Sequence, residues 1–184
     1  MMSQAELVTR VERVRSGETH AWGELYQELA PSVFRLCRRV LPTREDAEDA
    51  TTEVFLKLRV KLAQYDPQRP LRPWLFKLAA NHCWDELRRR RRLRESGDVD
   101  SLGAENPGPS PLAFLLAEQE RKEVRAALAK LNDRDRLALA MRYYAELSYE
   151  EIAEVLGMTS TAIGVLLLRA RRRLRLLLAD KGGA

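Results

Sequence analysis

Hydrophobic residues recur along most of this chain at the three- and four-residue steps of an α-helix, and the strict alternation of a β-strand is nearly absent. Ala47, Ala50, Val54 and Leu58 follow this spacing behind Thr43, and acidic residues fill the first turns. The Thr43 hydroxyl suits a helix N-cap, and negative charge is favourable at a helix N-terminus. The pattern therefore predicts a helix here, ending before the next proline, and an all-α protein.

A second long helix is predicted to begin at Trp74, after a proline-bounded loop over 66–73, and to run into an arginine-rich segment. We expect Leu75, Leu78 and Ala79 to form its buried side. Side chains three or four positions apart share a helix face. One face of this helix therefore carries an aromatic ring, an amide and several charges, from Trp74, Lys77, Asn81, Asp85 and Arg88.

Glycine, proline and serine concentrate between positions 96 and 111, among acidic residues. Such a composition is typical of a flexible linker rather than of a helix. It separates residues 1–95 from residues 112–184, and no internal repeat relates the two parts. The sequence therefore predicts two small helical domains joined by a flexible linker.

The second part contains the sequence pattern of a helix-turn-helix between Ser148 and Ile163. A helix is expected after Ser148, and Gly157 stands where the chain must turn sharply. Either Thr159 or Ser160 caps the following helix. This spacing favours a DNA-binding motif, and the alternative is a helical hairpin with a purely structural role.

Charge is unevenly distributed along the 184 residues, which carry a formal net charge of +5. Arginines cluster at 85–94 and at 169–175, whereas 44–53 is acidic. A single arginine run is more often a solvated helix end, but two runs in a small chain favour binding to nucleic-acid phosphates. The exposed aromatic and amide face around Trp84 suits unpaired bases, with burial of the tryptophans in the core as the alternative.

Metal binding, cofactor binding and catalysis are not expected. His82 and Cys83, with His20 and Cys37, lack the paired spacing of metal ligands. No glycine-rich phosphate loop or nucleophile motif is present. No signal peptide or apolar run of membrane-spanning length occurs either, so we expect a cytoplasmic protein without membrane insertion.

Taken in order, these segments resemble the sigma-70 family, specifically its compact extracytoplasmic-function branch, over nearly the whole chain. Residues 46–49 and 53–55 are similar to region 2.2, which in the family binds core RNA polymerase. The resemblance therefore implies bacterial core RNA polymerase as a partner. The implied polymerase-binding residues are Asp46, Glu48, Asp49, Glu53 and Phe55.

The two arginine-rich segments are similar to the family's promoter-binding regions. The helix from Trp74 resembles regions 2.3 and 2.4, which melt and read the minus-ten element, and the preceding loop at 65–73 stands where the family captures a flipped-out base. The segment from Leu147 to Arg171 resembles region 4.2, which binds the minus-thirty-five element. The implied DNA-binding residues are Trp74, Lys77, Asn81, Trp84, Asp85, Arg88, Arg89, Ser160, Thr161, Arg169, Arg172 and Arg173.

The sequence departs from the family pattern in two places. Thr52 stands where glutamine is usual, and Gly164, Val165 and Leu166 replace polar and basic residues of the recognition helix. These three side chains cannot make bidentate base contacts. The function expected is that of a sigma factor directing promoter-specific initiation, with an anti-sigma factor as a further candidate partner for the apolar patch. The alternatives are a helix-turn-helix regulator that binds DNA without polymerase, and a sigma-like protein with altered minus-thirty-five recognition.

Overall fold

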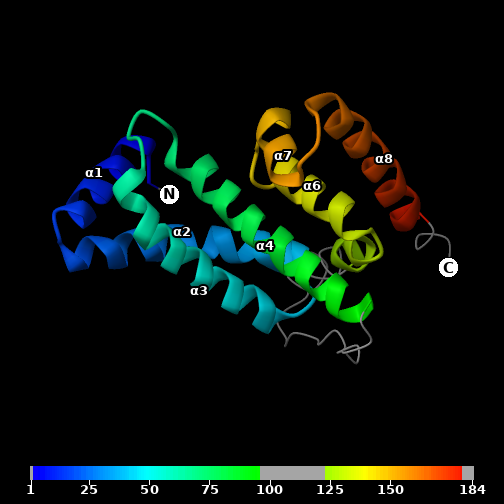
Figure 1. Cartoon of the computed structure of the whole chain (residues 1–184), viewed down its shortest axis with the longest axis horizontal. Helices are drawn as coiled ribbons and strands as arrows, with labels where there is room; N and C mark the ends of the chain where they lie inside the picture. The colour runs from blue at the N-terminus through cyan, green and yellow to red at the C-terminus, as the bar shows by residue number, and fades with distance from the viewer. Residues whose placement is uncertain (1, 96–122, 180–184) are drawn as a thin grey trace, which may run out of the picture.

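The computed structural model describes residues 2–95 and 123–179, and every regular element in these ranges is a helix (Figure 1). This confirms the predicted all-α fold. The predicted linker at 96–111 lies outside the described residues. The first helical unit consists of α1 (Gln4–Arg15), α2 (Thr19–Val40), α3 (Arg44–Lys61), a short 3-10 turn (Leu62–Gln64) and α4 (Leu71–Glu95).

Capping boxes fix the starts of two helices in this unit. The Thr43 hydroxyl accepts a hydrogen bond from the Asp46 amide, and the Asp46 carboxylate accepts one from the Thr43 amide. Ser3 and Glu6 form the same pair at the start of α1. Each box satisfies backbone donors that lack partners inside the helix. The Thr43 N-cap predicted for α3 and its predicted end before the next proline are therefore confirmed, whereas the sequence analysis does not predict α1.

The long helix α4 begins at Leu71, three residues before the predicted start at Trp74. The sequence analysis places Pro73 in the loop, but Pro73 lies in the first turn of α4, where no hydrogen bond from its nitrogen is needed. The Leu71 amide donates to the Gln4 side chain of α1 at 3.1 Å. A tertiary contact thus fixes the beginning of α4.

The second unit is smaller and contains the predicted helix-turn-helix. Residues 123–129 are helical, and Asn132 caps α6 (Asp133–Tyr143). α7 (Tyr149–Leu156) ends at Gly157, which adopts the left-handed conformation with φ 64°. α8 (Ser160–Ala179) then leaves at 93° to α7, the near-perpendicular arrangement typical of this motif. The Thr159 hydroxyl accepts from the Ala162 amide, so Thr159 is the cap.

The two units share one hydrophobic core, because α6 and α7 pack against α2 and α4 (Figure 1). Polar contacts reinforce this interface. Arg136 of α6 is buried and donates to the Val40 carbonyl at 2.9 Å. The Tyr144 hydroxyl donates to the Ser32 carbonyl at 3.1 Å, and an ion pair joins Lys77 of α4 to Glu154 of α7. The second unit therefore lies against one side of the first.

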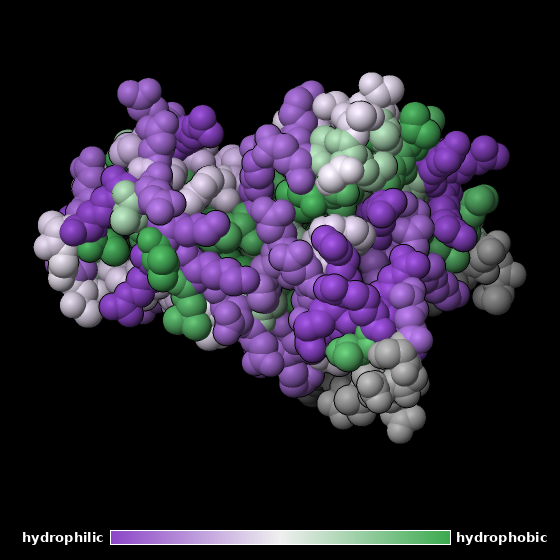
Figure 2. Space-filling model, viewed as in Figure 1, coloured by the Kyte–Doolittle hydropathy of each residue, from purple (hydrophilic) through white to green (hydrophobic). Residues whose placement is uncertain are grey.

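Among the described residues, no single helix is long and apolar enough to span a membrane, although the bent α7–α8 pair passes the test of length and composition. Most of the surface in view is hydrophilic, with apolar patches over α3 and over the α7–α8 end (Figure 2). The exposed large apolar side chains of these helices are Leu56, Val60, Tyr149, Val165, Leu168 and Leu176.

Candidate nucleic-acid and polymerase interfaces

The exposed acidic face of α3 is narrower than the sequence suggests. Asp49 and Glu53 lie one turn apart, both exposed, and form no ion pair with another described residue. Glu48 is also exposed but pairs with Arg44 at 2.7 Å. Leu56 continues the line of Asp49 and Glu53 toward the end of the helix. This face therefore presents two free carboxylates followed by apolar surface.

Asp46 is tied to α4 and offers little surface. It pairs with Arg90, and its side chain is 17% exposed. Burial raises the pKa of Asp46, but hydrogen bonds from Arg90 and Thr43 outweigh it, so the pKa lies below its ordinary value. Glu86 also pairs with Arg90, at 2.6 Å. The carboxylate of Asp46 thus stays charged and holds α3 against α4.

Phe55 is buried rather than presented on the surface. Its ring lies 4.7 Å from the Tyr26 ring and 6.2 Å from the Trp22 ring, in both cases edge to face. Edge-to-face pairs of this kind stabilise a core beyond the area that they bury. Phe55 therefore joins α3 to α2, and its position on α3 sets the outward direction of the neighbouring carboxylates.

The polar face predicted for α4 is accessible along its length. Asn81, Asp85 and Arg88 are exposed and follow one another at helical steps. Lys77 is partly covered and is held by Glu154 of α7. Arg89 is exposed but pairs with Glu86 at 2.8 Å. This face presents an amide beside a carboxylate, together with the Arg88 guanidinium, which forms no ion pair with another described residue.

The two tryptophans of α4 differ in their surroundings. Trp74 is half-buried, with its ring 5.2 Å from that of Tyr65. Trp84 is also half-buried, and the Arg134 guanidinium of α6 lies over its ring at 5.7 Å. Neither ring is fully enclosed in the core. Each side chain therefore keeps part of its surface exposed, and the Arg134 guanidinium lies over one face of the Trp84 ring.

The loop before α4 is held by α1. The Gln4 side chain donates to the Tyr65 hydroxyl and to the Arg69 carbonyl, both at 3.2 Å. Arg15 donates to the carbonyls of Leu62 and Tyr65. Within these anchors, residues 66–70 are exposed. α1 thus fixes both ends of a short loop whose tip faces solvent.

The recognition helix α8 carries three kinds of exposed side chain. Its buried side is formed by Ile163, Leu167 and Ala170. Thr161 near its start is exposed, whereas Ser160 is partly covered. The remaining exposed positions are apolar in the middle, mostly basic further on, and apolar again at the end, namely Val165, Leu168, Arg169, Arg171, Arg172, Arg173, Arg175, Leu176 and Ala179.

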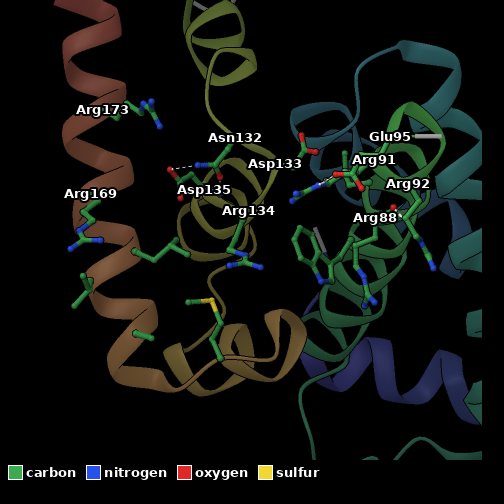
Figure 3. A pocket seen from close by; sticks show the side chains of 16 residues that line it. Arg88, Arg91, Arg92, Glu95, Asn132, Asp133, Arg134, Asp135, Arg169 and Arg173 are labelled. Carbon is green, nitrogen blue, oxygen red and sulfur yellow. Dashed lines mark hydrogen bonds and ion pairs between the residues drawn. The ribbon is translucent and has the colours of Figure 1, made fainter. Parts of the chain in front are cut away.

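A groove of about 1180 Å³ runs between α4 on one side and α6 and α8 on the other. Figure 3 shows arginines of α4 and of α8 on opposite sides of this space, with residues of α6 between them. Its apolar lining includes Trp84, Met158 and Val165, and its rim includes Arg88 and Arg169. The structure thus brings predicted DNA-binding residues of both units to one groove.

The polymerase-binding and DNA-binding sets do not merge. Asp49 and Glu53 lie on α3, outside this groove. Six arginines line the groove, and some of them are predicted DNA-binding residues. The functional candidates missed by sequence reasoning are Arg134, Leu168 and Leu56. Helical spacing along the sequence predicts that these three side chains are exposed. It does not reveal their neighbours, because these lie on other helices. Among the described residues, no group of three or more His, Cys, Asp or Glu side chains could hold a metal ion.

Two family descriptions match the chain. Residues 25–93 match "Sigma-70 region 2" and residues 121–174 match "Sigma-70, region 4". The chain is 30% identical to the ECF RNA polymerase sigma factor SigM of Bacillus subtilis, over 84% of this chain and 93% of SigM. It is also 30% identical to the RNA polymerase sigma factor CnrH of Cupriavidus metallidurans, over 89% of each chain.

Solved structures are similar to the fold as a whole. CnrH in complex with the cytosolic domain of CnrY gives a TM-score of 0.63 at 23% identity, covering 94% of this chain and 97% of that one. The sigma factor RpoE of Bartonella quintana, in complex with the anti-sigma factor NepR, gives 0.64 at 24% identity, covering 85% and 97%. Both similarities concern the fold alone.

Proposed function

Because this chain belongs to the sigma-70 family, in its extracytoplasmic-function branch, we propose an assignment of its surfaces to core RNA polymerase and to promoter DNA. The chain is a sigma factor that binds core RNA polymerase and directs promoter-specific initiation. The separation of charge carries the assignment. Carboxylates that pair with no other described residue lie on α3, whereas the arginine-rich surfaces lie on α4 and α8.

Asp49 and Glu53 are the polymerase contacts in this proposal. They are exposed and without a described ion-pair partner, so they are available to a basic protein surface, whereas DNA would repel them. Glu48 takes part at the edge of this face. Asp46 and Phe55 act by positioning, because one is paired with Arg90 and the other is buried.

The face of α4 holds the opened minus-ten strand. Asn81, Asp85 and Arg88 are exposed there and offer hydrogen bonds and charge, and Trp84 offers part of a ring for stacking. The loop at 66–70 lies at the beginning of the same helix and suits the capture of an unstacked base. Trp74, Lys77 and Arg89 complete this surface.

The helix-turn-helix anchors the upstream duplex. Thr161 and the backbone amides at the start of α8 suit a phosphate, since helix N-termini attract anions. Arg169, Arg172 and Arg173 suit further phosphates, with Ser160 as a short-range donor. This surface supplies affinity through phosphate contacts irrespective of how bases are read.

We assign residues 1–95 and 112–184 to two domains joined by 96–111, and place the protein in the cytoplasm. The family is one of transcription initiation factors rather than enzymes. For this chain we propose that it catalyses no reaction itself. An anti-sigma factor is proposed as a further partner, because two structurally similar sigma factors are found in complexes with other proteins, one of them named as an anti-sigma factor.

The test is runoff transcription with purified bacterial core polymerase on a pool of genomic promoter fragments. Wild type is expected to initiate at a shared sequence. Asp49→Arg is expected to abolish core binding, measured separately by co-purification, because it places a cation on the acidic face. Glu12→Arg makes the same charge change at an exposed position of α1 and serves as the control.

Asn81→Ala is expected to retain core binding but to impair strand opening, measured by permanganate reactivity of unpaired thymines. Gln27→Ala removes an exposed amide from α2 and is the matched control. Normal core binding without specific starts would favour a polymerase-occupying protein that does not read promoters. Absence of core binding would overturn the assignment of α3 and favour a regulator that binds DNA alone.

A further inference from the structure

The centre of the outward face of α8 is apolar, and this bears on which bases the helix can read. Thr161, Val165, Leu168 and Arg172 follow at steps of four, three and four, so they form one face opposite the buried stripe. Val165 is 45% exposed and Leu168 is 65% exposed. Single exposed apolar residues are common, but two adjacent ones at the middle of a recognition helix lie where a major groove would be read.

Tyr149 of α7 enlarges this apolar surface. A Cβ added at Gly164 would lie 3.6 Å from the Tyr149 ring, so the ring lies beside the backbone of the recognition helix. Tyr149 is itself 39% exposed, and the Arg142 guanidinium lies 5.4 Å from its ring centre. Val165, Leu168 and the Tyr149 ring together form what we name the apolar reading patch.

Basic residues follow the patch along α8 and favour a polyanion as its partner. Arg169 and Arg172 are exposed on adjoining positions, and Arg173 and Arg175 follow on the next turn. A protein partner with an apolar groove would not need this density of cations, whereas a DNA duplex places phosphates on both sides of its major groove. Charge complementarity therefore commits the patch to duplex DNA.

The only strongly apolar group that a base pair displays in the major groove is the C5-methyl group of thymine. Val165 and Leu168 cannot donate or accept hydrogen bonds, and Gly164 presents no side chain, so bidentate reading of guanine or adenine from these positions is impossible. Resting on the proposed function, we propose that α8 reads its upstream element through thymine methyl groups contacted by the apolar reading patch. It therefore selects thymine over cytosine at those positions.

The test replaces single thymines of the upstream element by deoxyuridine, which lacks only the methyl group. Holoenzyme, formed from the full chain and bacterial core polymerase, is bound to promoter duplexes carrying the element shared by the starts of the runoff experiment. Each contacted methyl is expected to contribute about fourfold in affinity, which corresponds to ~0.8 kcal/mol. Replacing cytosine by 5-methylcytosine at a contacted position is expected to raise affinity by a similar factor.

Val165→Ser and Leu168→Ser are expected to bind thymine and deoxyuridine duplexes equally well at the position each contacts. Leu176→Ser, an exposed apolar position further along the same helix, is the matched control and should keep the fourfold difference. The difference should persist between low and high salt, because it does not arise from phosphate contacts, although overall affinity falls as salt rises.

Equal affinity for thymine and deoxyuridine at every position of the upstream element would overturn the proposal, as would the absence of any shared upstream element. Loss of core binding in Val165→Ser would overturn it in favour of a protein contact. These results are distinct from failure of the proposed function, which would appear as wild-type chain that does not bind core polymerase or initiate at any specific site.

Discussion

Arg136 offers the sharpest test of how the two units are joined. It is buried, and its Nε donates to the carbonyl of Val40, at the end of α2, where no intrahelical donor is available. Its other nitrogens donate to Asp133 at 2.6 Å and to the Leu131 carbonyl at 3.4 Å. A cation at this end of α2 also interacts favourably with the helix dipole. One side chain of α6 thus caps a helix of the first unit.

Replacing Arg136 by alanine removes both the cap and a buried aliphatic stem. A buried carbonyl left without a partner costs about 1–3 kcal/mol. The two methylenes that alanine lacks, Cγ and Cδ, contribute about 0.8 kcal/mol each, or roughly 1.6 kcal/mol together. We therefore expect Arg136→Ala to lower the free energy of unfolding by about 3–5 kcal/mol.

Urea unfolding followed by far-ultraviolet circular dichroism measures this change. Arg136→Lys keeps most of the aliphatic stem but loses the forked donors of the guanidinium. Its loss of unfolding free energy should therefore be less than half that of Arg136→Ala. Arg91→Ala removes an exposed arginine paired with Glu95 and should change stability by less than about 0.5 kcal/mol. If Arg136→Ala proved no more destabilising than Arg91→Ala, the described packing of α6 against α2 would be refuted.

Three further changes test local features. Because the pKa of Asp46 is lowered in the folded state, its pair with Arg90 stabilises the fold above about pH 4, and this stabilisation is lost as pH falls through the folded-state pKa. Asp46→Asn should therefore lower the free energy of unfolding by about 1–2 kcal/mol at pH 7 and by progressively less in acid. Urea unfolding at several pH values measures this change. Gly157→Ala should lower the free energy of unfolding by about 1–2 kcal/mol because of the left-handed backbone alone, since a Cβ there meets no neighbour. A smaller loss of stability in thermal unfolding would contradict this. Tyr144→Phe removes the hydrogen bond to Ser32 and should lower the free energy of unfolding by about 0.5–1.5 kcal/mol. Amide hydrogen exchange in α6 should become faster, and unchanged exchange would argue against that contact.

Local signals made the helix-turn-helix and the start of α3 predictable. Thr43 and Ser148 form capping boxes with residues three positions on, and Gly157 adopts the conformation that its place in the sequence requires. These features depend on neighbouring residues alone. The same signal, Ser3 followed by Glu6, was present for α1 and would have revealed that helix. Pro73 misled because its position in the first turn depends on where α4 begins.

The surroundings of the site residues could not be predicted in the same way. Helical spacing places Asn81 and Asp49 on outward faces, and both are exposed. Phe55 is buried because α2 supplies two aromatic rings, and Asp46 is occupied because α4 supplies Arg90. These partners lie on other helices, at distances along the chain that no local pattern encodes. Helical periodicity therefore identified the outward faces, but it did not identify which residues on them remain exposed and unpaired with other described residues.

The common groove of α4 and α8 has a consequence for promoter binding. Elements centred at minus ten and minus thirty-five are about 25 base pairs apart, or ~85 Å along a duplex, whereas Trp84 and Val165 border one groove. The roughly 27 positions at 96–122 could span about 90 Å if fully extended. Reading both elements at once therefore requires the units to separate and the Arg136–Val40 contact to break. Substitutions that weaken this interface should lower the stability of the free protein and raise its affinity for a promoter.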